Sequence, residues 1–246
     1  MKPHKQRLDL LLVERGLVAT REKAQRIILA GEVLVDDQPE TKAGTKIVET
    51  AEIRLRSEPS HYVSRSALKL KGGLEAFGVN CAGRIGLDIG ASTGGFTQVL
   101  LEMGATGVFA LDVGHNQLDW KIRSDTRVTV FEGVNARNLR REDLGRSFDL
   151  IVMDVSFISV TKILPALIAF AGPTTDWIIL IKPQFEVGRE QIARGGIVKD
   201  EEVRNKAVEF VCSTARELGL KVLGTAKASI TGTDGNQEYL AHFRLQ

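Results

Sequence analysis

The feature that most constrains this 246-residue sequence is a series of short apolar runs alternating with helical patterns after Ser64. Strand-like runs are expected at 85–89, 108–112, 128–131, 148–154 and 177–182, and helices at 66–77, 96–103, 161–170 and 201–218. Strands that alternate with helices predict a mostly parallel, doubly wound α/β sheet. The last two strands, at 221–230 and 238–243, flank a tight turn at 232–236. Such a closing hairpin adds one antiparallel strand.

Polar residues stand at the carboxyl ends of five of these predicted strands. They are Asp88 with Gly90, Asp112, Asn135, Asp154 and Lys182. Because ligands of doubly wound sheets bind at this edge, the repeated placement predicts a ligand site there. Lys182 is the most informative of them. An unpaired ammonium group at the end of a buried strand is costly, so a carboxylate partner is expected.

The segment "LDIGASTGGFTQVLLEMGATGVFALDVG" carries the cofactor signal. Its glycines are expected to let the backbone approach a ligand at a helix N-terminus, and Asp112 could accept hydrogen bonds from two ribose hydroxyls. Asp88 suits a cation such as an ammonium or sulfonium better than a pyrophosphate. The combination resembles Rossmann-like S-adenosylmethionine-dependent methyltransferases, with a generic nucleotide fold as the alternative. This resemblance implies cofactor contacts from Asp88, Gly90, Ser92, Thr93, Gly94, Gly95, Phe96, Asp112, Val113 and Asn135.

Residues 1–57 are expected to form a separate, small α+β domain. A leucine-rich helix ends near Gly16, Thr20 is expected to cap a second helix, and short strands follow from residue 32. The SEPSHY segment then predicts a linker at 58–63, before a larger domain at 64–246.

The segment "RLDLLLVERGLVATREKAQRIILAGEVLVDDQ" resembles the αL RNA-binding module of a small-subunit ribosomal protein, pseudouridine synthases and tyrosyl-tRNA synthetases. The resemblance implies that Arg7, Arg21, Lys23 and Arg26 face RNA phosphates. Basic side chains outnumber acidic ones in residues 1–31, and the reverse holds in 32–58. This excess suits a polyanion, although a solvated helix face explains the same charges.

Four charged residues carry a further resemblance. Asp154 and Lys182 end neighbouring predicted strands, and Glu238 begins the last one. Lys69 is expected beside Arg65 on a polar helix stripe opposite an apolar one. Taken singly, these charges have simpler explanations, such as a solvated lysine, a turn cap or a hairpin end. Together, in "YVSRSALKLKGGL", "IVMDVSFIS", "LIKPQFEVGREQI" and "GNQEYL", they resemble the Lys-Asp-Lys-Glu tetrad of FtsJ-type ribose 2′-O-methyltransferases. With the N-terminal module, the chain resembles the TlyA family, historically labelled haemolysins.

That resemblance implies methylation of a cytidine 2′-hydroxyl in 16S or 23S ribosomal RNA, or both. Lys182 would stabilise the developing alkoxide, Asp154 would orient Lys182, and Lys69 and Glu238 would fix the ribose. Because the four pKa values would be coupled, no single proton acceptor is assigned. RNA contacts are expected from Arg65, Arg189 and Arg194, with the loop of the last two ordering on binding, and from Phe157 and Phe185. The two phenylalanines would stack a splayed base, with core packing as the alternative.

Three other functions compete with this one. Base amine methylation favours Asn/Asp-Pro-Pro-aromatic where this chain has Asp154-Val-Ser-Phe157. A pore-forming haemolysin would need a membrane-length apolar run or a signal peptide, and neither is recognisable. An inactive RNA-binding protein is the third. Cys81, Cys212 and the four histidines show no ligand spacing, so no metal is expected. The chain is expected to be cytoplasmic, free of membrane and a monomer or weak dimer, with ribosomal RNA or ribosomal subunits as partners.

Overall fold

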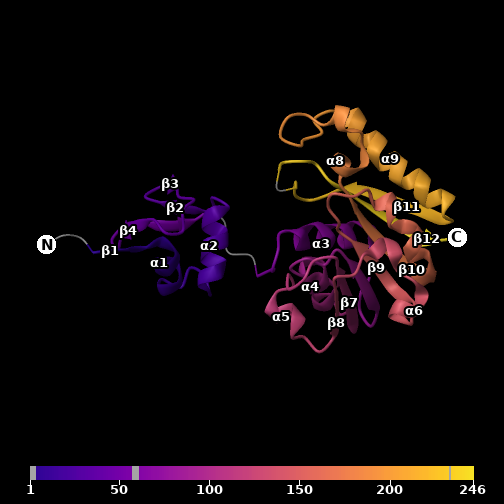
Figure 1. Ribbon diagram of the computed structural model, residues 1–246, viewed down its shortest axis with the longest axis horizontal. Helices are drawn as coiled ribbons and strands as arrows, with labels where there is room; N and C mark the ends of the chain where they lie inside the picture. The colour runs from indigo at the N-terminus through magenta and orange to yellow at the C-terminus, as the bar shows by residue number, and fades with distance from the viewer. Residues whose placement is uncertain (1–3, 57–60, 233) are drawn as a thin grey trace. The chain divides into compact units, whose positions relative to one another are not determined.

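The computed structural model describes residues 4–56, 61–232 and 234–246 (Figure 1). The chain divides into two units, Met1–His61 and Tyr62–Gln246. Residues 58–60 of the expected linker, Pro59 among them, lie outside the described residues.

The first unit pairs two helices with short strands, as expected. The helices are α1 (Leu8–Glu14) and α2 (Arg21–Leu29). The strands are β1 (Lys5–Arg7), β2 (Val33–Val35), β3 (Gln38–Pro39), β4 (Lys46–Val48) and β5 (Ile53–Leu55). They form a three-stranded sheet of order β3-β2-β5 and a separate β1-β4 pair. Thr20 accepts a hydrogen bond from the backbone N–H of Lys23, which is the expected N-cap of α2. Leu8, Leu12 and Ile28 are fully buried between the helices and strands.

The second unit is built on a seven-stranded sheet. Its strands are β6 (Ile85–Ile89), β7 (Gly107–Asp112), β8 (Val128–Glu132), β9 (Phe148–Met153), β10 (Ala171–Ile181), β11 (Leu220–Lys227) and β12 (Tyr239–Leu245). Their order is β11-β12-β10-β9-β6-β7-β8, and β12 runs antiparallel to both neighbours. The doubly wound sheet with one antiparallel strand is therefore confirmed.

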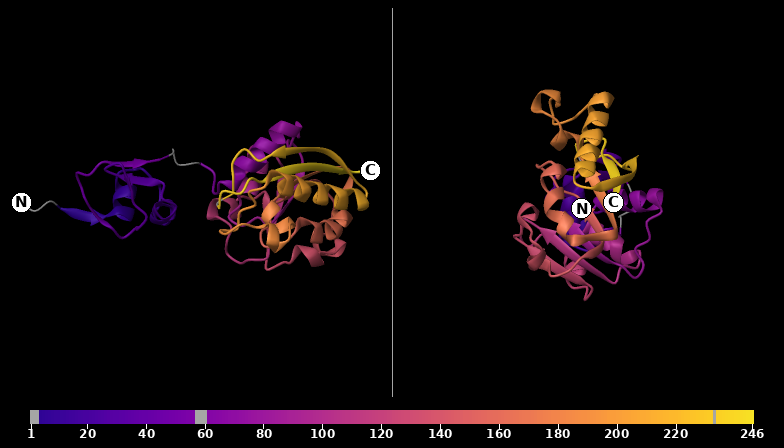
Figure 2. Two further views of the ribbon diagram at one scale, coloured as in Figure 1. Left: turned by 90° about the horizontal axis from the view of Figure 1, so that it is seen from above. Right: turned by 90° about the vertical axis from the view of Figure 1, so that its right-hand side faces the viewer.

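Helices cover both faces of this sheet (Figure 2). On one face, α3 (Ser66–Phe77) and α4 (Gly95–Glu102) pack against Leu150, Val152 and Ile178. On the other, α6 (Arg141–Leu144), α7 (Leu164–Leu167) and α9 (Glu201–Glu217) pack with Ile151 and Met153. Successive residues of a strand point to opposite faces, so a strand covered on both sides reads as the continuous apolar run seen in the sequence.

The structure differs from expectation where helices are short. The helix expected at 161–170 is broken into η2 (Val160–Lys162), α7 and η3 (Ile168–Phe170). Pro165 lies in the first turn of α7, where proline's missing N–H costs no helical bond. Three single-turn helices, α5 (Trp120–Arg123), α6 and α8 (Pro183–Glu186), were not expected from the sequence. Helices this short depend on tertiary packing more than on local pattern.

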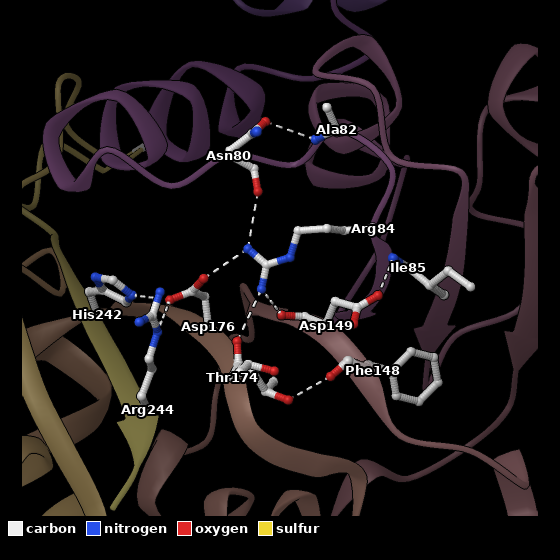
Figure 3. Close-up of polar contacts among 11 residues, drawn as sticks. Asn80, Ala82, Arg84, Ile85, Phe148, Asp149, Thr174, Asp176, His242 and Arg244 are labelled. Carbon is white, nitrogen blue, oxygen red and sulfur yellow. Dashed lines mark hydrogen bonds and ion pairs between the residues drawn. The ribbon is translucent and has the colours of Figure 1, made fainter.

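An ionic network closes the amino edge of the sheet (Figure 3). Asp176 on β10 is 2% exposed, and it accepts hydrogen bonds from Arg84, His242 and Arg244. Burial opposes ionisation of this carboxyl, but the three donors outweigh it and hold the pKa at about 2. Arg84 also donates to the backbone carbonyls of Asn80 and Asp149, as Figure 3 shows. The network therefore ties four distant segments together at the edge opposite the strand ends that carry the candidate site.

Candidate active site

Lys182 and Asp154 meet at the carboxyl edge of the sheet. Strands β9 and β10 run parallel with Met153 and Ile179 in register, so the residues that follow them lie close together. The Nζ atom of Lys182 lies 2.6 Å from Oδ1 of Asp154 and donates to Oγ of Ser156 at 2.8 Å. Lys182 is 9% exposed, and Asp154 supplies the carboxylate that such burial requires. Ser156 was not foreseen, since a serine in a loop carries no signal in the sequence.

A second buried ion pair joins Lys69 to Glu238. The Nζ atom of Lys69 lies 2.5 Å from Oε2 of Glu238, and the two residues are 7% and 2% exposed. The expectation of a polar stripe on α3 is wrong for Lys69, although Arg65 is exposed. Helix α3 packs against β10, β11 and β12, and this packing removes Lys69 from solvent. Glu238 precedes β12, which begins at Tyr239, instead of starting the strand.

A cavity of about 430 Å³ lies beside the Lys182–Asp154 pair. This volume is typical of a small-molecule site. Its lining contains seven residues expected from the sequence, namely Gly90, Ser92, Asp112, Val113, Asn135, Asp154 and Phe157. It also contains residues that were not foreseen, among them Gln117, Arg137 and Ser156. Exposed polar side chains in loops have no periodicity, so the sequence offered no way to find them.

Asp112 is fixed by backbone donors at the end of β7. Its carboxylate accepts from the N–H groups of Ser92 at 2.8 Å and Gly114 at 2.7 Å. Each carboxylate oxygen keeps a second lone pair. The orientation therefore leaves acceptors for the hydroxyls of a ribose in the cavity.

The glycine-rich turn is also constrained by the protein atoms around it. A Cβ at Gly90 would lie 2.4 Å from the carbonyl oxygen of Asp154, and one at Gly95 would lie 2.4 Å from Oγ of Ser64. Neighbouring protein atoms, and not only a ligand, therefore exclude side chains there. In the part of the chain that the structure describes, the cavity lining does not include Asp88, Thr93, Gly94, Gly95 or Phe96. Phe96 is 2% exposed and belongs to the core.

Asp88 lies fully buried behind this turn. Its Oδ2 accepts from Oγ1 of Thr97 at 2.7 Å, while Oδ1 has no hydrogen-bond partner among the described residues. Burial raises the pKa of this carboxyl to about 7, and the negative charges of Asp154 and Asp112 add to the shift. Three carboxyl groups therefore share one region. A ligand carrying positive charge, such as a sulfonium and an ammonium, fits that environment.

Phe157 lines the cavity, and its ring lies beside that of Phe185. The rings of Phe157 and Phe185 are 5.3 Å apart and inclined by 51°. Phe157 is 92% exposed, so it is not part of the core, and Phe185 is half-buried. Phe157 also has a φ of +66°, a strained backbone conformation for a residue with a side chain. Strained residues of this kind cluster at active sites and ligand clamps.

The expected RNA contacts of the first unit include two arginines held by one buried carboxylate. Asp9 is fully buried and accepts from Nε and Nη2 of Arg7, from Nε of Arg21 and from Nε2 of Gln25. The hydrogen bond from Arg7 is the largest of several contacts that hold the pKa of Asp9 well below its usual range. Arg7 and Arg21 keep 41% and 49% of their side-chain surface exposed. Asp9 was not foreseen as their common anchor.

The other expected RNA contacts lie on exposed surface, with Lys23 half-buried. Arg26 is exposed on α2, and Arg65, Arg189 and Arg194 are exposed in the second unit. Arg189 begins the short helix η4 (Arg189–Gln191), and Arg194 lies in a turn closed by a bridge between Ala193 and Ile197. The loop expected to order only on binding thus has regular backbone hydrogen bonds.

Comparison with known sequences settles the family. The profile described as FtsJ-like methyltransferase matches residues 62–245, and the profile described as S4 domain matches residues 6–53. The chain belongs to the FtsJ-like methyltransferases. Its cofactor is S-adenosylmethionine, which agrees with the acidic surroundings of the cavity and with the acceptors that Asp112 presents.

Three relatives resemble nearly the whole chain. The 16S/23S rRNA (cytidine-2′-O)-methyltransferase TlyA of Mycobacterium tuberculosis is 45% identical over 98% of this chain and 90% of its own length. Hemolysin A of Brachyspira hyodysenteriae is 43% identical over 96% of this chain and 99% of its own. The solved structure of a candidate hemolysin from Streptococcus thermophilus is 42% identical, covers 100% of this chain and 90% of that one, and superimposes with a TM-score of 0.78. Within the described residues of this FtsJ-like chain, no helix has the length and apolarity needed to cross a membrane.

Proposed function

We propose that this chain transfers a methyl group from S-adenosylmethionine to the ribose 2′-hydroxyl of cytidine in ribosomal RNA, of the 16S molecule, the 23S molecule or both. The observation that carries the proposal is the ammonium group of Lys182, which is held by Asp154 and Ser156 beside the cofactor cavity. We expect the reaction in the cytoplasm, on ribosomal RNA or ribosomal subunits.

Lys182 is proposed to bind the 2′-oxygen that attacks. A ribose hydroxyl is a weak nucleophile, and a positive charge at hydrogen-bond distance stabilises the alkoxide that develops on it. When bound, S-adenosylmethionine supplies an electrophilic methyl group on a sulfonium. Asp154 would orient the Lys182 side chain through their ion pair, and Ser156 would fix the direction of its N–H groups. Lys69 and Glu238 are proposed to hold the ribose from the other ion pair.

The Phe157–Phe185 ring pair is proposed to receive the target base. Splaying the cytidine out of its stack would bring its ribose and 2′-hydroxyl to the Lys182–Asp154 pair and leave the base free to be contacted. The exposed ring of Phe157, with Phe185 behind it, offers a surface on which a splayed base can stack. Arg65, Arg189 and Arg194 would contact the flanking phosphates.

The first unit is proposed to be the part that holds structured RNA, with residues 1–57 as the RNA-binding domain, 58–63 as a linker and 64–246 as the catalytic domain. Support comes from the S4 match over residues 6–53 and from the exposed guanidinium surfaces of Arg7 and Arg21. Contacts of this type position a protein on RNA and weaken with salt.

The test is transfer of a labelled methyl group to ribosomal subunits from a strain that lacks the enzyme. The product expected is 2′-O-methylcytidine, which makes the adjacent phosphodiester resistant to alkali. We expect Lys182→Ala to reduce the rate by at least about 100-fold, the usual effect of removing a donor to a developing oxyanion. Lys221→Ala, which changes an exposed lysine of β11, should retain the parent rate. Label on a base nitrogen, or full activity of Lys182→Ala, would refute the proposal.

A further inference from the structure

Two segments that carry expected functional residues meet at one buried side chain. The loop at 188–198 carries the exposed Arg189 and Arg194, and the turn segment at 234–238 ends on Glu238. Asn236 belongs to that turn, contacts the loop and is only 1% exposed. A buried amide of this kind needs partners for both its carbonyl and its NH₂ group.

Asn236 finds those partners on the arginine loop. Its Oδ1 accepts from the backbone N–H of Val198 at 2.9 Å, and its Nδ2 donates to the carbonyl of Gly196 at 2.8 Å. Val198 is itself 1% exposed, so the base of the loop is anchored by packing as well. The side chain of Asn236 thus closes the loop that presents Arg194.

The backbone of Asn236 is also connected to the Lys69–Glu238 ion pair. Its carbonyl accepts from the N–H of Gly232 at 2.8 Å, which folds the turn over Glu238. A Cβ at Gly232 would lie 2.6 Å from Oε1 of Glu238, so the turn lies directly against that carboxylate. The carbonyl of Glu238 accepts from the N–H of Ala228 at 2.8 Å, and its side chain holds Lys69. Asn236, which anchors the loop, is therefore two positions before Glu238, with only Gln237 between them.

We propose that Asn236 is a positioning residue that couples the arginine loop to the Lys69–Glu238 pair. RNA bound by Arg189 and Arg194 fixes the loop, and through Asn236 the loop fixes the turn that bounds the Glu238 carboxylate. Substrate bound at the loop thereby restricts the turn further against a pair that is already formed. This inference rests on the proposed function, in which the two arginines contact RNA and the pair holds the ribose.

The chemistry of an amide is what the coupling requires. An aspartate at position 236 could still accept from Val198 N–H, but it could not donate and would face the Gly196 carbonyl with negative charge. An alanine would leave both backbone groups without this partner, that of Val198 in a buried place. Asn236→Asp therefore removes the hydrogen bond to Gly196 alone, and Asn236→Ala removes the hydrogen bonds to both Gly196 and Val198.

The experiment is a double-mutant cycle on methyl transfer to ribosomal subunits. In the parent protein, Arg189→Ala/Arg194→Ala is expected to lower kcat about tenfold as well as to raise KM. In the Asn236→Ala background kcat is already low, and the arginine substitutions should then change KM alone. Asn205→Ala on the exposed side of α9 is the matched control and should leave the cycle unchanged. If the arginine substitutions lowered kcat by the same factor in the parent protein and in the Asn236→Ala background, the inference would be overturned.

Hydrogen exchange separates this inference from the proposed function. On addition of ribosomal RNA, the amides of Gly232 and Ala228 should gain protection in the parent protein, together with those of 189–197. In Asn236→Ala the loop should still gain protection while the turn does not. Unchanged affinity for S-adenosylmethionine and an intact thermal transition show that each variant is folded. Protection confined to the loop of the parent protein would overturn the coupling even where methylation is normal. Coupled protection without methylation would instead refute the proposed function.

Discussion

Lys69 and Glu238 are 169 positions apart in the chain, and their side chains form a buried ion pair with 2.5 Å between Nζ and Oε2. The pair joins α3, the first helix of the second unit, to the segment just before its last strand, β12. Taking two charges out of water is costly, and their mutual attraction offsets that cost only while both are present. The pair therefore makes the two ends of this unit depend on each other.

Substituting both members of this pair should lower the free energy of unfolding by less than the sum of the two single substitutions. We expect Glu238→Gln to lower the free energy of unfolding by about 3 kcal/mol, because Lys69 is then a buried, unpaired cation. Lys69→Met/Glu238→Gln should lose clearly less than the sum of the two single variants. Urea unfolding of the four proteins gives the comparison. Strictly additive losses would show that the two side chains do not interact.

Cofactor affinity should depend on the protonation of Asp88. Its pKa is raised to about 7 by burial and by the nearby Asp154 and Asp112. The ionised form attracts a cation, so S-adenosylmethionine should bind up to about tenfold more tightly at pH 8 than at pH 6. Calorimetric titration across this range measures the change.

The same group gives an opposite trend in the stability of the cofactor-free protein. Because the folded protein binds the proton of Asp88 more tightly than the unfolded chain does, its contribution to stability should fall as pH rises from about 4 to about 7. Asp88→Asn should flatten both profiles. A cofactor affinity that keeps its full pH dependence in Asp88→Asn would assign the effect to another group.

Substitution of Phe157 should lower methyl transfer without lowering the stability of the protein. Its ring is 92% exposed and its φ is +66°, so Phe157→Gly removes little packing and relieves backbone strain of about 1 kcal/mol. We expect this variant to be at least as stable as the parent while methyl transfer to RNA falls by about tenfold or more, through loss of base stacking. Phe210→Ala, at a half-exposed phenylalanine of α9, is the control and should leave the rate unchanged. Unchanged methyl transfer in Phe157→Gly would exclude the stacking role.

For Asp9→Asn, net charge and side-chain geometry predict opposite changes in RNA affinity. Asp9→Asn makes the first unit more positive, which by charge alone should strengthen RNA binding. The structure leads to the opposite expectation, because Asp9 fixes the guanidinium groups of Arg7 and Arg21. We expect about fivefold weaker binding of ribosomal RNA at low salt, measured by filter binding. Glu22→Gln, with the same charge change at an exposed site of α2, should bind equally well or more tightly. Tighter binding by Asp9→Asn would mean that net charge alone decides affinity.

Much of this fold could be predicted because its signals are local. Continuous apolar runs located the strands, and polar residues after those runs located the edge where Asp154 and Lys182 meet. What the sequence could not predict depends on contacts between distant segments. The burial of Lys69 depends on β10, β11 and β12, which come much later in the chain than α3. Asn236 likewise finds its partners in a loop of a different segment, Gly196 and Val198. The positive φ of Phe157 follows from how its loop is held and has no residue signature.

Acid stability should depend on Asp176, far from the chemistry. This carboxylate is held at a pKa of about 2 by Arg244, His242 and Arg84 against the effect of burial. A carboxyl whose pKa is lowered on folding stabilises the protein above its ordinary pKa, and the contribution is lost as pH falls from about 4 towards 2. We expect Asp176→Asn to lower the free energy of unfolding at pH 7 by about 3 kcal/mol and to weaken its decrease between pH 4 and 2. Glu209→Gln, which breaks an exposed pair with Arg216, should cost less than about 1 kcal/mol.

Because the network closes the amino edge of the sheet and the site lies at the carboxyl edge, kcat/KM of Asp176→Asn at 25 °C should stay within about twofold of the parent. A large loss of kcat/KM in a variant that is still folded would show that the two edges of the sheet are coupled.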